Sequence, residues 1–279
     1  GFVCANHHVN NLVQRPSVGM ATLFTGTTPS RHGIVSDNWI DRLKNKETDC
    51  PFDNAYSTIG SDSKLGQRSA SRLMTPTLGD RLKLVTKGRA RVFSVAMNDY
   101  AAIFSAGHSA DGAYWLDETT GNMISSSFYM DKYPVWITEF NKYKLSDKYL
   151  ETPWKTLYEP ISYNESVENA SLHETGFLDK YSSFPYDLKK LKKESGGTYS
   201  ILKSTPFANT YLKDFVLQLI PKEQIGYDFV SDLLTIVFSS MDKNCGNFGP
   251  LSVEMEDTYL RMDKEIAGLL KYIEDGYGV

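Results

Sequence analysis

Two short apolar runs, each bounded by polar residues, predict buried β-strands. They are residues 91–97 (RVFSVAM) and residues 233–238 (LLTIVF). Further along, apolar residues recur at helical spacing through residues 253–272, which predicts a long amphipathic helix. Strands that alternate with helices favour an α/β fold with a doubly wound, mostly parallel sheet. The buried side of the long helix is expected to carry Leu260, Ile266, Leu269, Leu270 and Ile273.

Two prolines mark predicted helix starts. Pro16 fits the first helical position, so residues 17–24 are expected to form a short buried helix. Thr75 followed by Pro76 predicts the N-cap and the first residue of another helix, which extends to Val85. The buried side of this helix is expected to hold Leu78, Leu82 and Leu84.

The remaining segments suggest how the domain is organised. Residues 3–13 predict a strand that runs into a loop, and the polar residues 44–67 predict a surface loop. Residues 110–197 are aromatic-rich and irregular, and we expect them to form an inserted cap over the carboxyl edge of the sheet, where α/β enzymes bind ligands. The α/β core would then comprise residues 1–109 and 198–279.

Composition narrows the class of protein. The chain has 279 residues, and its hydrophobic content of 41% is enough for a sizeable core. A net charge of −4 argues against a dedicated nucleic-acid binder, which would carry a basic face. No apolar run approaches the length of a membrane helix, so no transmembrane segment is expected.

Cysteine usage and the two ends of the chain do not narrow the class of protein further. Cys4, Cys50 and Cys245 are widely separated and form no CxxC pair, so one disulfide stays open and its pairing is undecided. The chain opens on GFVCANHH, which has no signal-peptide pattern. We expect both ends of the domain to be incomplete.

Three blocks carry a resemblance to a known family, namely residues 24–41 (FTGTTPSRHGIVSDNWID), 106–130 (AGHSADGAYWLDETTGNMISSSFYM) and 238–266 (FSSMDKNCGNFGPLSVEMEDTYLRMDKEI). In order along the chain, they are similar to segments of the phosphate-irrepressible alkaline phosphatases, which use a threonine nucleophile. That branch belongs to the alkaline phosphatase superfamily, together with the nucleotide pyrophosphatase/phosphodiesterases. The resemblance implies an alkaline-phosphatase type of sheet with an inserted aromatic-rich cap.

The resemblance also implies a chemistry, which is phosphoryl transfer by two zinc ions and a Thr or Ser nucleophile at a helix N-terminus. The nucleophile position falls on Pro16, which has no hydroxyl, and the following His position falls on Met20. Ser17 is one residue away. It is either a displaced nucleophile or an ordinary serine that caps the helix start, and a one-residue gap in the match would place it in the nucleophile position.

The phosphate-binding and metal-binding positions are substituted as well. The family's phosphate-contacting Asn falls on Asp37, with Asn38 displaced by one residue. Its Lys-x-Arg pair, which stabilises the transferred phosphoryl oxygens, falls on Asn98 and Tyr100. Asp242 matches one zinc-ligand Asp, but the His four residues later is Gly246. The remaining family ligands would lie outside this chain, so zinc is expected to be reduced or absent.

The histidines give little support for another metal site. His32 and His108 lie in the first and second blocks, where hydrogen-bonded turn residues are expected. His7 and His8 adjoin each other near the substituted nucleophile position, and His173 lies in a polar stretch.

Three functions follow from this pattern. The first is a catalytically degenerate homologue, a pseudoenzyme that keeps the fold and has a binding or scaffold role. The second is an active metal-dependent phosphohydrolase with a rebuilt site, acting on a phosphate monoester or diester. The third is a structural subunit of a surface complex that holds a protein or glycan partner. The resemblance implies a periplasmic or cell-surface location.

Overall fold

The computed structural model describes residues 5–6, 15–43, 45–166 and 174–278. The N-terminal half contains α1 (Pro16–Thr25), α2 (Pro29–His32), β1 (Asn38–Asp41), β2 (Lys46–Asp49), β3 (Thr58–Ile59), α3 (Leu78–Val85), β4 (Val92–Ala96), α4 (Asp99–Ala106), β5 (Gly112–Leu116) and β6 (Met123–Ser126). The C-terminal half contains α5 (Val135–Lys142), α6 (Leu145–Glu151), the 3-10 helix η1 (Pro160–Ser162), α7 (Leu188–Glu194), the 3-10 helix η2 (Tyr199–Ser204), α8 (Phe207–Lys222), β7 (Leu233–Val237), α9 (Ser240–Phe248) and α10 (Val253–Tyr277).

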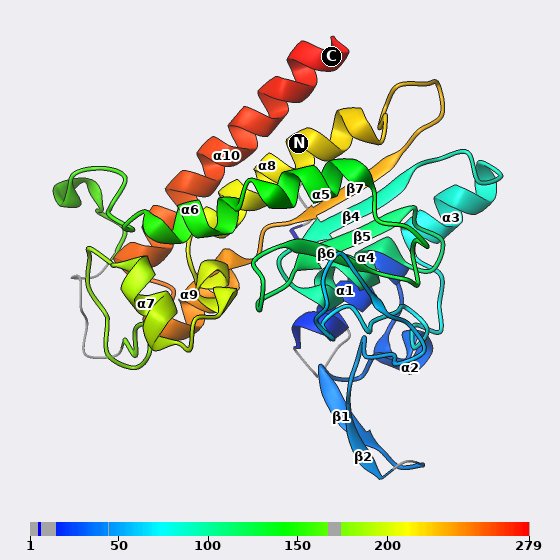
Figure 1. Cartoon of the computed structure of the whole chain (residues 1–279), viewed down its shortest axis with the longest axis horizontal. Helices are drawn as coiled ribbons and strands as arrows, with labels where there is room; N and C mark the ends of the chain where they lie inside the picture. Colours follow the sequence, from blue (N-terminus) through cyan, green and yellow to red (C-terminus); the bar gives the residue numbers. More distant parts are fainter. Residues whose placement is uncertain (1–4, 7–14, 44, 167–173, 279) are drawn as a thin grey trace.

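A five-stranded sheet with the order β3-β6-β5-β4-β7 forms the centre of the described part of the chain. The strand β4 pairs in parallel with both β5 and β7. The β5–β6 and β6–β3 pairs are antiparallel. A separate hairpin, β1–β2, projects from the body of the molecule (Figure 1). The chain therefore has a mixed α/β fold, and β5, β4 and β7 form the parallel part of the sheet that the sequence predicts.

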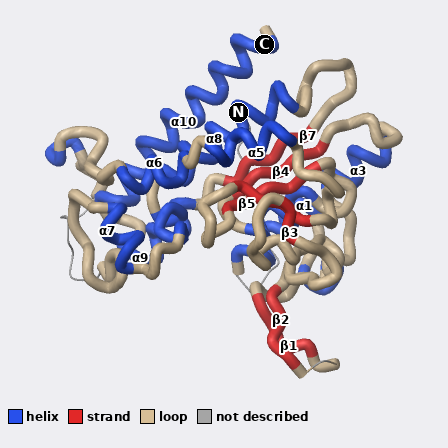
Figure 2. Tube along the Cα trace, viewed as in Figure 1, coloured by secondary structure: helices blue, strands red, loops and turns tan. Residues whose placement is uncertain are grey.

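Two hydrophobic cores lie on opposite faces of this sheet because side chains alternate along a strand. From β4, Phe93 and Val95 point into a core with α5 and α8, and Val92 and Ala96 point into a second core with α1 and α4. Figure 2 shows helices on both sides of the strands. Because the pocket described below lies at one end of β4, both cores help to hold its walls in place.

Several predicted elements are confirmed. Residues 17–24 lie in α1, and residues 91–97 contain β4. Residues 233–238 contain β7, all five residues of which are half-buried. Residues 253–272 lie in α10, although Leu270 is 53% exposed while its neighbour Leu269 is buried. The strand expected at residues 3–13 falls almost entirely outside the described residues.

The predicted start of the helix before β4 is wrong. The N-cap of α3 is Thr77, not Thr75, because Thr77 and Asp80 form a reciprocal capping box. Leu78 and Leu84 are 59% and 67% exposed, so the expected buried side is wrong for these two residues, whereas Leu82 packs against the second core. The helix α3 instead packs on β4 through Gly79, where an added Cβ would lie 2.7 Å from a methyl group of Val92.

Residues 44–67 are more ordered than the expected surface loop. They contain β2 and β3, and Cys50 is almost fully buried. The division of the chain into a core and a cap over residues 110–197 stays a prediction, but β5 and β6 lie in that range and belong to the central sheet. Among the described residues, no helix is both long enough and apolar enough to cross a membrane.

Candidate functional site

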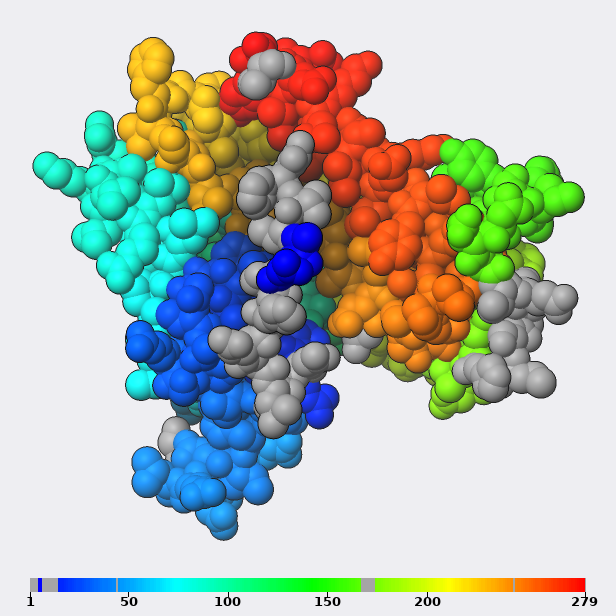
Figure 3. Space-filling view, turned by 180° about the vertical axis from the view of Figure 1, so that it is seen from behind, coloured from blue at the N-terminus to red at the C-terminus, as the bar shows by residue number. Residues whose placement is uncertain are grey.

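A pocket of about 390 Å³ lies at the carboxyl ends of β4 and β7, where parallel α/β sheets bind ligands. It brings together four of the positions singled out in the sequence: Pro16, Met20, Tyr100 and Asp242. Seen from behind in Figure 3, the blue surface of the α1–α2 region and the orange surface of the α9–α10 region share one face of the molecule. The described lining residues are Pro16, Gly19, Met20 and Leu23 of α1, Tyr100 and Ala101 of α4, Val237 of β7, Met241 and Asp242 of α9, and Phe238 and Ser239 between these two elements.

The start of α1 forms one wall of this pocket. Pro16 occupies the first turn and offers neither a hydroxyl nor an N–H. The next residue, Ser17, is fully buried. Its hydroxyl donates to Oδ1 of Asp37 at 2.6 Å, and its backbone N–H donates to the same oxygen at 3.1 Å. The expected capping role of Ser17 is therefore not observed, because it is the carboxylate of Asp37 that satisfies a first-turn N–H of α1.

The other two helices that meet the pocket each carry an acidic residue in the first turn. Asp99 is in the first turn of α4, and its Oδ1 accepts the backbone N–H of Tyr100 at 2.7 Å. Asp242 is in the first turn of α9. Helix N-termini attract anions through free N–H groups and the helix dipole. At α1 and α4 a carboxylate of the chain itself accepts a first-turn N–H, and in α9 Asp242 adds negative charge to the first turn.

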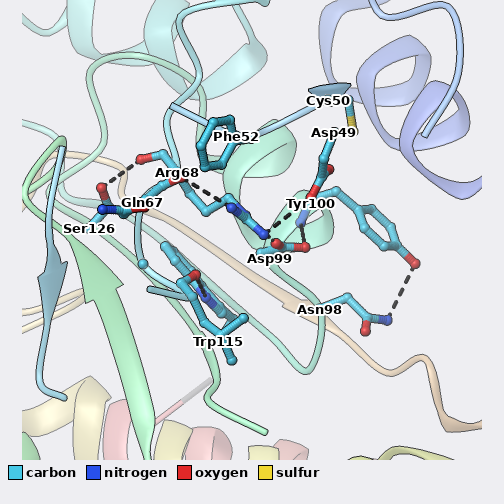
Figure 4. Close-up of polar contacts among 12 residues, drawn as sticks. Asp49, Cys50, Phe52, Gln67, Arg68, Asn98, Asp99, Tyr100, Trp115 and Ser126 are labelled. Atoms are coloured by element: carbon cyan, nitrogen blue, oxygen red, sulfur yellow. Dashed lines mark hydrogen bonds and ion pairs between the residues drawn. The ribbon is translucent and has the colours of Figure 1, made fainter. Parts of the chain in front are cut away.

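Tyr100 stands where the resemblance implies an arginine. Burial raises the pKa of its phenol, and the nearby carboxylates of Asp242, Asp37 and Asp99 raise it further. The hydroxyl is therefore neutral at physiological pH and accepts a hydrogen bond from Nδ2 of Asn98 at 3.3 Å. Figure 4 shows this Asn98–Tyr100 pair beside the neighbouring acidic residues.

Arg68 is a cation close to these carboxylates, but it is already paired. Its Nε lies 2.6 Å from Oδ2 of Asp99, and its Nη2 lies 3.1 Å from Oδ2 of Asp49 (Figure 4). Burial and then the charge of Asp99 raise the pKa of Asp49 to about 6, although Arg68 acts in the opposite direction. Burial raises the pKa of the Cys50 thiol far above the usual range. This thiol is therefore not a thiolate nucleophile at neutral pH.

Lys203 is a residue near the site that the sequence did not reveal. Its Nζ lies 2.9 Å from Oδ1 of Asn98 and 2.6 Å from Oε1 of Glu118. It comes from η2, 105 residues after Asn98, so no local spacing connects the two. The structure thus places a lysine next to the substituted Lys-x-Arg positions, but Glu118 balances its charge.

The residues around the pocket do not fit a two-zinc site. Structural and catalytic zinc needs three or four His, Cys, Asp or Glu ligands that converge on one point. Nowhere in the described ranges do three such residues come close enough to hold a metal ion. Asp242 lines the pocket, whereas Gly246 has no side chain to offer and Asp37 is engaged by Ser17. Asn38 points elsewhere, since its amide donates to Glu47 at 2.8 Å.

The described histidines are structural. His32 is buried, accepts the N–H of Ile34 at Nδ1, and faces Thr22 Oγ1 through Nε2 at 3.0 Å. His108 contacts Asp80 through Nδ1 and the Leu73 carbonyl through Nε2, so both ring nitrogens donate. His7, His8 and His173 lie outside the described residues. Cys50 and Cys245 are free thiols, and Cys4 also lies outside that part of the chain.

Comparison with known proteins agrees with this architecture. A family model for type I phosphodiesterase/nucleotide pyrophosphatase matches residues 17–278. The alkaline phosphatase PhoV of Synechococcus elongatus is 36% identical over 279 residues, which cover 100% of this chain and 50% of that protein. The alkaline phosphatase PafA of Elizabethkingia meningoseptica is 34% identical over 281 residues, which cover 100% of this chain and 51% of PafA. A Myroides odoratus protein named calcium-transporting ATPase is 38% identical over 281 residues, which cover 100% of this chain and 51% of that protein.

Solved structures show the same relationship. The crystal structure of wild-type PafA superposes with a TM-score of 0.91 and 33% identity, over 97% of this chain and 52% of that chain. A PafA variant, with one Thr replaced by Ser and an Asn, a Lys and an Arg replaced by Ala, gives a TM-score of 0.92. The chain spans about half the length of the curated relatives it matches. The family resemblance and the fold predicted from the sequence are both confirmed.

Proposed function

The chain belongs to the type I phosphodiesterase/nucleotide pyrophosphatase family, and we propose that it is a degenerate member that keeps the fold and uses its pocket for binding. In this proposal the pocket does not carry out two-metal phosphoryl transfer. Two of the relatives named above, PhoV and PafA, are alkaline phosphatases by name, so the proposal concerns the residues that differ at the site of this chain.

One observation carries the proposal, which is the pairing of Ser17 with Asp37. Phosphoryl transfer to a serine needs its oxygen exposed to the phosphorus and its surroundings positive enough to attract a dianion. Ser17 is instead fully buried, and its hydroxyl and N–H both point at a carboxylate. The carboxylate that accepts these bonds repels the substrate that the nucleophile would have to meet.

The rest of the pocket supports the same proposal. When bound, zinc would activate the attacking oxygen and stabilise the leaving oxygen. Asp242 is the one described family-ligand position that keeps a ligand side chain. Tyr100 and Asn98 replace two cations whose role is to stabilise developing negative charge. We derive no catalytic step through zinc, because the described residues do not supply its ligands.

The test is hydrolysis of p-nitrophenyl phosphate and bis(p-nitrophenyl) phosphate by the protein in its native length, with added zinc. We expect turnover that is no higher than that of the Ser17→Ala variant. Zinc-dependent turnover that disappears in Ser17→Ala would overturn the proposal and establish an active, rebuilt phosphohydrolase.

The location and the partners are also proposals. A periplasmic or cell-surface location follows from the family, and cell fractionation with an antibody to the native protein tests it. A scaffold role in a surface complex predicts a protein or glycan that co-purifies in stoichiometric amount. Such a partner would bind equally well after substitution of Asp242, because a scaffold does not use the pocket.

A further inference from the structure

The wall of the pocket between α1, α4 and α9 is mostly apolar. Met20 and Leu23 contribute aliphatic and thioether surface from α1, and Met241 does so from α9. Tyr100 and Phe238 add aromatic side chains. Methionine adapts its shape to irregular ligands, and aromatic rings bury large areas. A volume of about 390 Å³ is within the range of small-molecule sites.

One carboxylate stands at the mouth of this apolar pocket. Asp242 is the charged side chain among the described lining residues, and it is solvent-exposed. The two cations that contact Asp99 and Asn98 are paired with carboxylates other than Asp242. Arg68 lies against Asp49 and Asp99, and Lys203 lies against Glu118. The mouth of the pocket therefore presents negative charge next to an apolar interior.

Resting on the proposed function, we infer that the pocket binds a small organic cation with an apolar body, that is, a hydrophobic amine. Its apolar part would lie against Met20, Leu23 and Phe238. Its ammonium group would remain at the mouth, within reach of the carboxylate of Asp242 and the ring of Tyr100. A cation over an aromatic ring is stabilised by the ring's quadrupole, and a partly solvated charge avoids the full cost of desolvation.

An anion gains little in the same place. The helix N-termini of α1 and α4, which would otherwise favour it, already donate to Asp37 and Asp99. A phosphate group would also approach Asp242 and would meet no unpaired cation among the described lining residues. In this inference the pocket prefers a cationic ligand, whereas the site of a phosphatase binds an anionic one.

The experiment compares three probes with the same aromatic ring: benzylamine as the cation, benzyl alcohol as the neutral analogue, and phenyl phosphate as the anion. Their dissociation constants are measured by NMR titration at pH 7 and low salt, with and without zinc. We expect benzylamine to bind about tenfold more tightly than benzyl alcohol and phenyl phosphate to bind most weakly. The Asp242→Asn variant should weaken benzylamine about threefold and leave benzyl alcohol unchanged. The matched control is Asp275→Asn, on the exposed end of α10.

Each outcome separates the inference from the proposed function. If benzyl alcohol binds as tightly as benzylamine, or if Asp242→Asn changes nothing, the inference is wrong while the loss of phosphoryl transfer stands. If no probe binds, the inference is equally wrong. If phenyl phosphate binds most tightly and zinc strengthens it, both the inference and the proposed function are overturned.

Discussion

Ser17 donates two hydrogen bonds to a single carboxylate oxygen of Asp37, one from its hydroxyl at 2.6 Å and one from its backbone N–H at 3.1 Å. The two residues are 20 positions apart, and the chain returns to α1 through α2 and the turn before β1. The start of α1 is therefore electrostatically satisfied by the protein itself. A helix N-terminus that already binds a carboxylate of its own chain stabilises a phosphate only weakly.

The Ser17–Asp37 pair should contribute to stability. Ser17→Ala removes a charge-assisted hydrogen bond inside a buried site, and we expect the free energy of unfolding to fall by about 1–2 kcal/mol. Urea denaturation measures the change, and a double-mutant cycle with Asp37→Asn isolates the pairwise coupling. Ser30→Ala, at an exposed serine of α2, is the matched control. A cost no larger than that of the control would contradict the importance of the pair.

Neutralising Asp37 should make the site more receptive to anions. Asp37→Asn removes a negative charge from the N-terminus of α1 and leaves its dipole partly unopposed. We expect the affinity for inorganic phosphate to rise about three- to tenfold, which a phosphate titration monitored by NMR would detect. Asp41→Asn, on the β1–β2 hairpin, serves as the comparison. Equal phosphate affinity in Asp37→Asn and the unmodified protein would argue against this reading of the site.

The packing of α3 depends on the absence of a side chain at Gly79. An alanine there would place its Cβ 2.7 Å from Val92 Cγ1 and 3.2 Å from the carbonyl oxygen of Ala106. Because both neighbours belong to the core, we expect Gly79→Ala to lower the free energy of unfolding by about 1–3 kcal/mol. Gly268→Ala in α10 meets nothing within 4 Å and should instead stabilise by about 0.5–1 kcal/mol. Similar effects of both substitutions in thermal or urea unfolding would refute this packing argument.

His108 should make stability depend on pH above the ordinary pKa of histidine. Its hydrogen bond to Asp80 raises the pKa of the imidazole, and this outweighs the opposing effect of burial. A raised pKa means that the stabilisation is complete below the unfolded value of about 6.5 and is lost as the pH rises through the folded value. The destabilisation caused by His108→Gln should therefore be larger at pH 6 than at pH 9. Urea unfolding at both values checks this, and a cost that does not vary with pH would show that His108 is not charged in the folded protein.

Much of the fold could be predicted from local patterns. The strand β4 and the helices α1 and α10 follow from apolar periodicity and from Pro16. The cap of α3 was missed because Thr75-Pro76 and Thr77 are both plausible helix starts, and only the capping box with Asp80 decides between them. The strands β5 and β6 were missed because short runs such as GAYWL and MISS carry little periodicity.

The site could be predicted as a set of positions but not as a set of interactions. Family motifs pointed to Pro16, Met20, Tyr100 and Asp242, and the structure places all four around one pocket. The mutual satisfaction of Ser17 and Asp37 depends on how the chain turns back between α1 and β1. The contact between Lys203 and Asn98 joins segments 105 residues apart. Neither relationship has a signature at short sequence separation.

The most direct test of the account is the number of zinc ions bound per chain. It is measured by elemental analysis on the protein in its native length, purified without chelator and then equilibrated with zinc. Because Gly246 stands where the family has a zinc-binding His and Pro16 stands where it has the nucleophile, the account predicts less than about one-tenth of an equivalent. Two zinc ions per chain would contradict it and would identify the chain as a metal-dependent phosphohydrolase.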